Sequence, residues 1–190
     1  MDVLSHIVVD HNHLMNIFIW FSLVLAVFAS RNSPNVRWVA CSILLARTIG
    51  ILIYGWALTT EGWFYLIMSV QDAALILLIV KRHAVASVVA GLRLGALSQF
   101  AKECLSNFKM TSNELMYVLI LSVSVLVNIL ALIEREIRKF TEFNPMFIYN
   151  AYEPIKLVLT LFAVLAIMSL TIDAVRGFYS KDKVGEGQRQ

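Results

Sequence analysis

Long runs of apolar residues dominate the sequence, and they restrict the possible folds more than any other feature. A helix needs about 20 mostly apolar residues to cross the hydrocarbon core of a bilayer, which is roughly 30 Å thick. Of all residues, 59% are hydrophobic and 15% are charged, and the mean hydropathy is +0.74. Soluble domains usually carry about 25% charged residues. The sequence therefore predicts an all-α integral membrane protein with no separate soluble domain.

We expect five transmembrane helices, because five runs are long enough to span and each is bounded by charge, Pro or Gly. The first should remain as an anchor, since Asp2 and Asp10 precede it without any Lys or Arg, unlike the basic start of a signal peptide. Residues 1–180 then form one polytopic domain, and the polar residues 181–190 form a flexible cytoplasmic tail. The predicted spans cover about 14–29, 38–58, 63–80, 115–133 and 155–172.

The segment 84–110 decides the topology of the predicted bundle. From about 92 to 109, apolar residues recur at helical spacing while charged and polar residues occupy the other faces, as in an amphipathic helix at the membrane interface. Most Lys and Arg residues then lie on one side of the membrane, which predicts an outer N-terminus and a cytoplasmic C-terminus, in the manner of a bacterial inner-membrane protein. The alternative, that 84–110 is a sixth span, would divide the basic residues almost evenly.

Two opposite charges stand in the middle of the second and third apolar runs. If these runs form an antiparallel hairpin, Arg47 and Asp72 lie at one depth and can pair, with Gln71 beside them. A charge at bilayer depth costs about 2.5–3.5 kcal/mol even on lenient insertion scales, so it is rarely kept without a reason. Asn128 adds a polar group to the fourth span. Two interpretations stay open for this intramembrane polar site: a structural clamp between helices, or a group that exchanges a proton or ion.

Small residues at four-residue spacing predict close helix contacts, because lipid offers no hydrophobic driving force for helix association. One such stripe lies on the second span and another follows the third, and either could serve packing within the chain or between copies. The two stripes are Ser42, Ala46 and Gly50, and Ser87, Gly91 and Gly95.

Basic residues between the third and fourth spans favour contact with a soluble cytoplasmic protein or with anionic lipid. The candidate residues are Lys81, Arg82, Arg93, Lys102 and Lys109. The net charge of +3 and the pI near 9.0 fit basic loops that set membrane topology, and nucleic-acid binding is not expected.

The sequence offers no catalytic motif, no metal-binding spacing and no histidine within a span, so we expect no enzyme, metal or cofactor. Cys41 and Cys104 are expected to be small packing residues in a reducing compartment.

The preferred function is a non-enzymatic subunit of an oligomeric membrane assembly that acts as scaffold, sensor or regulator for a partner. The alternative is an ion, proton or small-solute pore or transporter, including a lytic pore of the holin type, that uses Arg47 and Asp72. The lipid bilayer and further copies of the chain are the expected partners.

Overall fold

A computed structural model describes residues 17–31, 33–60, 62–92, 95–106, 110–142 and 144–176. Within these residues every regular element is a helix, which confirms the predicted all-α class. An apolar helix, Ile17–Ala29, comes first. It is followed by α2 (Pro34–Thr59), α3 (Phe64–Val80), α4 (Arg82–Gly91), α5 (Ala96–Ser106), α6 (Ser112–Phe140) and α7 (Phe147–Val175).

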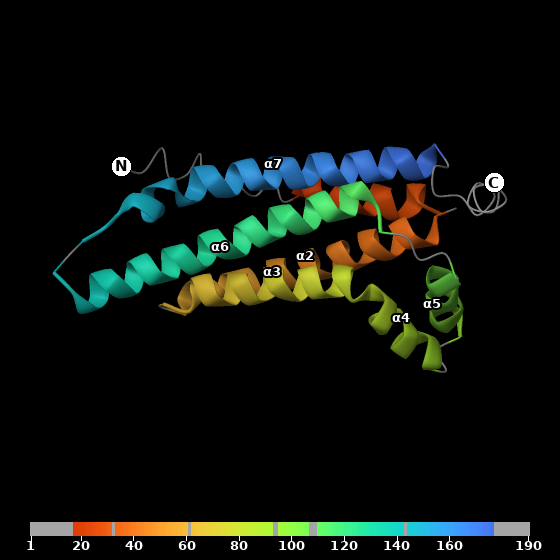
Figure 1. The fold of residues 1–190 in the computed structure, drawn as a ribbon, viewed down its shortest axis with the longest axis horizontal. Helices are drawn as coiled ribbons and strands as arrows, with labels where there is room; N and C mark the ends of the chain where they lie inside the picture. The colour runs from red at the N-terminus through yellow and green to blue at the C-terminus, as the bar shows by residue number, and fades with distance from the viewer. Residues whose placement is uncertain are drawn as a thin grey trace.

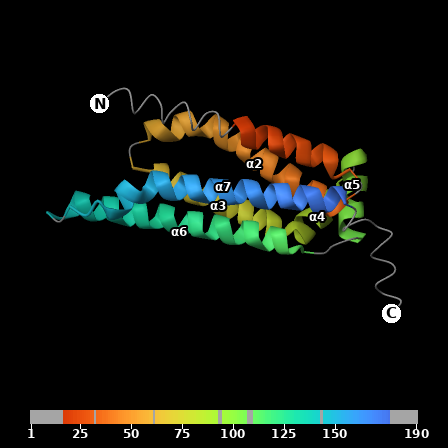
Figure 2. The same cartoon turned by 90° about the horizontal axis from the view of Figure 1, so that it is seen from above.

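The long helices lie side by side and alternate in direction, so that the chain crosses the bundle repeatedly (Figures 1 and 2). α6 packs between α3 and α7, and α2 contacts α3. The short helices α4 and α5 sit together at one end of the bundle, where α6 begins and α7 finishes (Figure 1). We call these two helices the α4–α5 cap.

Three helices, α2, α6 and α7, are long and apolar enough to cross a membrane. Only 22% to 33% of their most apolar stretches is buried within the protein, so most of these side chains face outward, as in lipid-facing helices. α3 and α4 pass the same test only as a pair bent by 74°, and Ile17–Ala29 is shorter than a span. Within the described residues the structure thus contains three candidate spans, or four if the bent pair is one span, and the count of five stays a prediction, because the start of the first predicted span lies outside these residues.

Small and branched apolar side chains fill the centre of the bundle. Leu23 and Val36 are completely buried, and they pack in one cluster with Leu121 of α6 and Ile167 of α7. The contact between α2 and α3 uses the first predicted stripe of small residues. The side-chain amide of Gln71 donates to the Ala46 carbonyl at 3.2 Å and lies directly against Gly50. Ser42, the third member of the stripe, donates to the Trp38 carbonyl of its own helix.

α5 lies within the segment 92–109 that the sequence predicts as an interfacial helix, and α4 precedes it as a second short helix. The chain bends sharply after Lys81, and two short helices are joined near Gly95, whose φ of +55° is a conformation that favours glycine. The second predicted stripe of small residues therefore does not form one helix face. Ser87 and Gly91 are exposed near the end of α4, and a Cβ on Gly91 or Gly95 would meet no other atom within 4 Å. Among the described residues, the two glycines of this stripe make no close helix contact.

α5 folds back onto the start of α2. The Cys104 thiol lies 3.1 Å from the Pro34 carbonyl oxygen, to which it donates a hydrogen bond. The rings of Trp38 and Phe100 stack with centroids 5.7 Å apart, and the Arg37 guanidinium lies over the Phe100 ring at 5.5 Å. These contacts attach the α4–α5 cap firmly to the bundle.

Candidate functional site

Polar side chains from three helices meet inside the bundle, where α3, α6 and α7 adjoin. We call this group the Asp72 cluster. Ser124 and Asn128 lie one turn apart on α6, and Tyr152 and Lys156 lie one turn apart on α7, so each pair projects from a single helix face. The cluster consists of Asp72, Ser124, Asn128, Tyr152 and Lys156.

Hydrogen bonds connect the cluster into one chain of groups. The Ser124 hydroxyl donates to Asp72 Oδ2 at 2.6 Å, and the Asn128 amide approaches the same oxygen at 3.4 Å. The Lys156 ammonium donates to the Ser124 oxygen at 2.6 Å and lies 3.7 Å from Asp72 Oδ2. The Tyr152 hydroxyl donates to the side-chain carbonyl oxygen of Asn128, Oδ1, at 2.9 Å. Lys156 therefore reaches the carboxylate mainly through Ser124, since direct charge-assisted hydrogen bonds are about 2.7–2.9 Å long.

The predicted pairing of Arg47 with Asp72 is wrong in detail, because Lys156 provides the ion-pair partner of Asp72. Arg47 lies in the same region, close enough to interact electrostatically with Lys156 and with Tyr117. Gln71 points away from the cluster and contacts α2. Of the four residues predicted to form the intramembrane site, the structure brings Asp72 and Asn128 into hydrogen-bond distance.

Lys156 stands only one residue inside the predicted span 155–172, a position typical of a lysine that extends its ammonium group to the interface. In the structure α7 already begins at Phe147, so Lys156 lies well inside the helix and its side chain is 25% exposed. The four-residue spacing of Tyr152 and Lys156 was the available signal for a polar face on α7.

A second charged contact lies at the foot of the α4–α5 cap. Arg82 Nη1 is 2.8 Å from Glu114 Oε2, and the two side chains are 4% and 0% exposed. Glu114 also completes a capping box at the start of α6, in which Thr111 and Glu114 exchange hydrogen bonds of 3.2 and 3.3 Å. Arg82 is thus a buried ion-pair residue, and its prediction as a surface contact for lipid or a partner is wrong.

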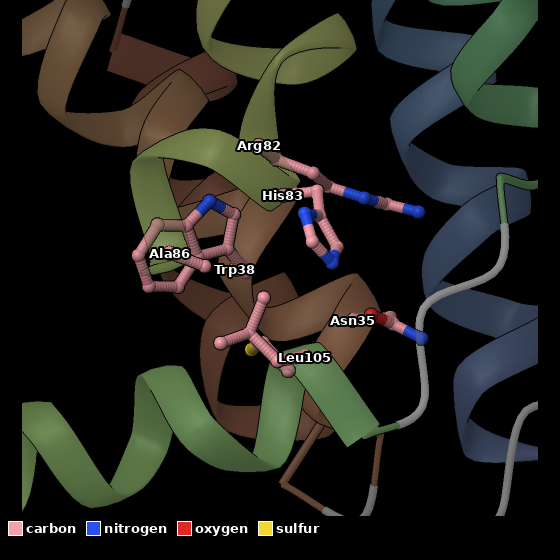
Figure 3. Close-up of a pocket in the computed structure, with 7 residues that line it drawn as sticks. Asn35, Trp38, Arg82, His83, Ala86 and Leu105 are labelled. Atoms are coloured by element: carbon pink, nitrogen blue, oxygen red, sulfur yellow. The ribbon is translucent and has the colours of Figure 1, made fainter. Parts of the chain in front are cut away.

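The other residues predicted to contact a partner have mixed positions. Lys81 and Lys102 are exposed on the α4–α5 cap, whereas Arg93 and Lys109 lie outside the described residues. A small recess opens between the cap and the start of α2 (Figure 3). Its lining comprises Asn35 and Trp38 of α2, Arg82, His83 and Ala86 of α4, and Cys104 and Leu105 of α5.

At the opposite end of the bundle, Glu134 of α6 holds the start of α7. Its two carboxylate oxygens accept the backbone N–H groups of Ile148 and Tyr149 at 3.2 and 2.8 Å. A carboxylate in this position satisfies unpaired N–H groups of the first helical turn and interacts favourably with the helix dipole. The Arg138 guanidinium lies over the Tyr149 ring at 5.0 Å, which further fixes the corner between α6 and α7.

The fold and these contacts define a class: an all-helical membrane protein whose bundle contains a hydrogen-bonded charge cluster. Among the described residues, no group of three or more His, Cys, Asp and Glu side chains is arranged to hold a metal ion. Comparison with protein-family models, with curated proteins and with solved structures finds no match for this chain.

Proposed function

We propose that this chain is a non-enzymatic membrane subunit that presents the α4–α5 cap, on the cytoplasmic side, to a soluble protein partner. The observation that carries the proposal is the rigid attachment of this cap to the bundle. A buried ion pair, a thiol hydrogen bond and a ring stack all hold it in one position. Pre-organised surfaces bind with a smaller entropy cost than mobile ones.

The exposed surface of the cap combines apolar and basic side chains. Val88 of α4 and Leu97 of α5 are 67% and 53% exposed, and two lysines, Lys81 directly before α4 and Lys102 of α5, are exposed as well. Such a surface suits an acidic partner with apolar anchors, because complementary charge guides association while apolar contacts supply affinity. Anionic lipid headgroups are the competing occupant of the same surface.

Native mass spectrometry of the chain purified in mild detergent tests this proposal. We expect a stoichiometric soluble protein in the complex, which the double change Lys81→Glu and Lys102→Glu should release. The matched control is Lys139→Glu, an exposed lysine at the opposite end of α6, which should leave the complex intact. Retention of the partner by the double variant, or bound anionic lipid in place of protein, would contradict the proposal. The same spectra give the copy number of the assembly.

A second candidate function, an ion- or proton-handling membrane protein, is favoured by the Asp72 cluster. The Asp72 and Lys156 side chains are 21% and 25% exposed within one chain, so their charged ends are not sealed from outside the bundle. Ionisable groups at bilayer depth that reach a cavity or a helix interface commonly mark ion pathways. This candidate predicts that Asp72→Asn leaves the fold intact and changes conductance or its pH dependence in reconstituted vesicles.

A further inference from the structure

Arg47 stands near the middle of α2, and no carboxylate among the described residues lies at ion-pair distance from it. Asp72 makes its ion-pair contact with Lys156 instead, at 3.7 Å. Each end of α2 is about 18–20 Å from Arg47 along the helix axis, so lipid phosphate groups at the membrane surface lie too far away to pair with it. An intramembrane charge is costly unless a partner compensates it, so Arg47 requires a counterion that these residues do not supply.

Glu153 of α7 is the other carboxylate near the Asp72 cluster, and it does not fill this role. It is exposed, and it acts electrostatically on Tyr152 and on Tyr54 of α2. Tyr54 stands seven residues after Arg47, which is about 10 Å farther along α2 and away from the α4–α5 cap (Figure 1). Glu153 therefore adds its negative charge near the far end of α2, while the charge of Arg47 lies near the middle of that helix.

A buried hydroxyl close to Arg47 also lacks an acceptor. Tyr117 of α6 is 2% exposed, and its hydroxyl has no hydrogen-bond partner among the described residues. Arg47 lies close enough to act on this hydroxyl electrostatically. A guanidinium group can only donate hydrogen bonds, so it leaves the O–H hydrogen of Tyr117 unpaired. Buried polar groups without a partner are rare in folded proteins, which makes this hydroxyl a marker for a bound ligand.

Arg47 and Tyr117 require the same kind of ligand. Both present hydrogen-bond donors, and Arg47 carries a positive charge without a counterion. A negative ion can accept hydrogen bonds from both donors and neutralise the charge, whereas a water molecule can accept but brings no charge. Lys156 adds positive charge to the same region, because Arg47 also acts on its ammonium group.

We propose that Arg47 and Tyr117 hold one small monovalent anion, a halide such as chloride, inside the bundle. The guanidinium and the phenol O–H donate to the ion, and the ion compensates the charge of Arg47. Arg47 is half-buried, so its guanidinium is not sealed from outside the single chain. Tyr117 packs in one buried cluster with Leu121 and Ile167, so an anion much larger than a single atom would have to displace these side chains.

Binding of radioactive chloride to the full chain in mild detergent tests the inference. Sodium gluconate, whose anion is too large for the site, keeps the ionic strength constant, and bound chloride is measured by scintillation proximity. We expect saturable binding of one chloride per chain, which bromide displaces and gluconate does not. Chloride should also raise the midpoint of unfolding by SDS, because a ligand that binds only the folded state stabilises it.

Variants separate a bound anion from a contact that only supports packing. Tyr117→Phe removes the hydroxyl and keeps the ring, so it should weaken chloride binding about tenfold, as expected for one lost hydrogen bond to a charged group. Without chloride the same variant should be at least as stable as the parent chain, because it removes a buried hydroxyl that has no acceptor. Arg47→Gln should lose chloride binding. The matched control is Tyr54→Phe, which removes a hydroxyl from an exposed tyrosine of α2 and should leave chloride binding unchanged.

Chloride binding that Tyr117→Phe leaves unchanged, or stabilisation by chloride no greater than that by gluconate, would overturn the inference. If Arg47→Gln does not fold, Tyr117→Phe still decides it, since this variant removes only one buried oxygen. The inference goes beyond the partner proposal and does not depend on it, so its failure would leave the experiment on the α4–α5 cap unaffected. The conductance of Asp72→Asn remains a separate test of the ion-handling candidate, because a chloride held at Arg47 need not cross the membrane.

Discussion

The buried ion pair between Arg82 and Glu114 gives the sharpest prediction about stability. Replacing Arg82 with Met leaves the Glu114 carboxylate, which is 0% exposed, without its cation, and replacing Glu114 with Gln leaves the guanidinium without its anion. Removal of one member of a buried pair typically costs about 3–5 kcal/mol. We therefore expect each single change to reduce the free energy of unfolding by about that amount.

The double variant distinguishes this explanation from simple loss of packing. Gln at position 114 can keep the capping box with Thr111, because Glu and Gln both serve in that position. Met fills much of the volume of the Arg82 side chain without a charge. Since neither partner is then left as a buried unpaired ion, the double variant should be much less destabilised than the sum of the two single changes.

Unfolding by increasing SDS in mixed micelles, followed by helical circular dichroism, measures these differences. A second readout is the alkylation rate of Cys104, which lies in the α4–α5 cap and should become more accessible when the single changes loosen the cap. The control pair is Arg135 and Glu136, whose side chains are 3.5 Å apart and 30% and 40% exposed, where single changes should cost about 0–1 kcal/mol. If the double variant loses as much unfolding free energy as Arg82→Met and Glu114→Gln lose together, the reasoning is refuted.

Three further predictions concern other contacts. Gly50→Leu should destabilise the bundle by about 0.5–1.5 kcal/mol in the same SDS titration, because the new side chain displaces the Gln71 side-chain amide from its hydrogen bond to the Ala46 carbonyl. Gly55→Leu faces open space and should not destabilise the bundle; equal effects would contradict the contact. Burial raises the pKa of the Cys104 thiol from 9.0 to about 12, so in the folded chain it should resist alkylation near neutral pH and react after unfolding in SDS. Because folding raises the pKa of this thiol, its contribution to the free energy of unfolding is complete below pH 9 and is lost as the pH rises from 9 to about 12. A pH series of unfolding curves should show this loss against a Cys104→Ala control. Glu134→Gln should cost about 0.5–2 kcal/mol by weakening the start of α7, while Glu136→Gln should stay near zero; similar losses would argue against the capping role.

Apolar periodicity was enough to predict the helical class and the approximate positions of α2, α3, α6 and α7, because bilayer-length runs leave few other folds open. The sequence also indicated that Asp72 and Asn128 belong to a polar interior. It indicated Arg47 instead of Lys156 as the partner of Asp72, because the sequence alone does not show which face of α7 turns toward α6. That choice depends on the packing of α7 against α6, which involves residues more than 30 positions apart.

The sequence indicated that the third span ends at Val80, but it did not indicate the sharp bend that follows Lys81. Residues 82–92 continue an apolar pattern with good helix formers, and no Pro interrupts them. The bend places Arg82 where it meets Glu114, and this tertiary contact compensates for burying the two charges. Local sequence reasoning assigned Arg82 to a surface cluster because it stands beside Lys81, which is exposed.

The buried polar residues of α6 explain how this bundle acquires a unique arrangement. In lipid, apolar surfaces gain little by meeting one another, so packing and polar contacts must select the helix partners. α6 makes such contacts along almost its whole length, with α4 near its start and with α3 and α7 farther along. A shift of α6 by one turn, about 5.4 Å, would break all of them together, so they fix its register as well as its neighbours. The four residues and their partners are Glu114 with Arg82, Ser124 with Asp72 and Lys156, Asn128 with Asp72 and Tyr152, and Glu134 with the first turn of α7.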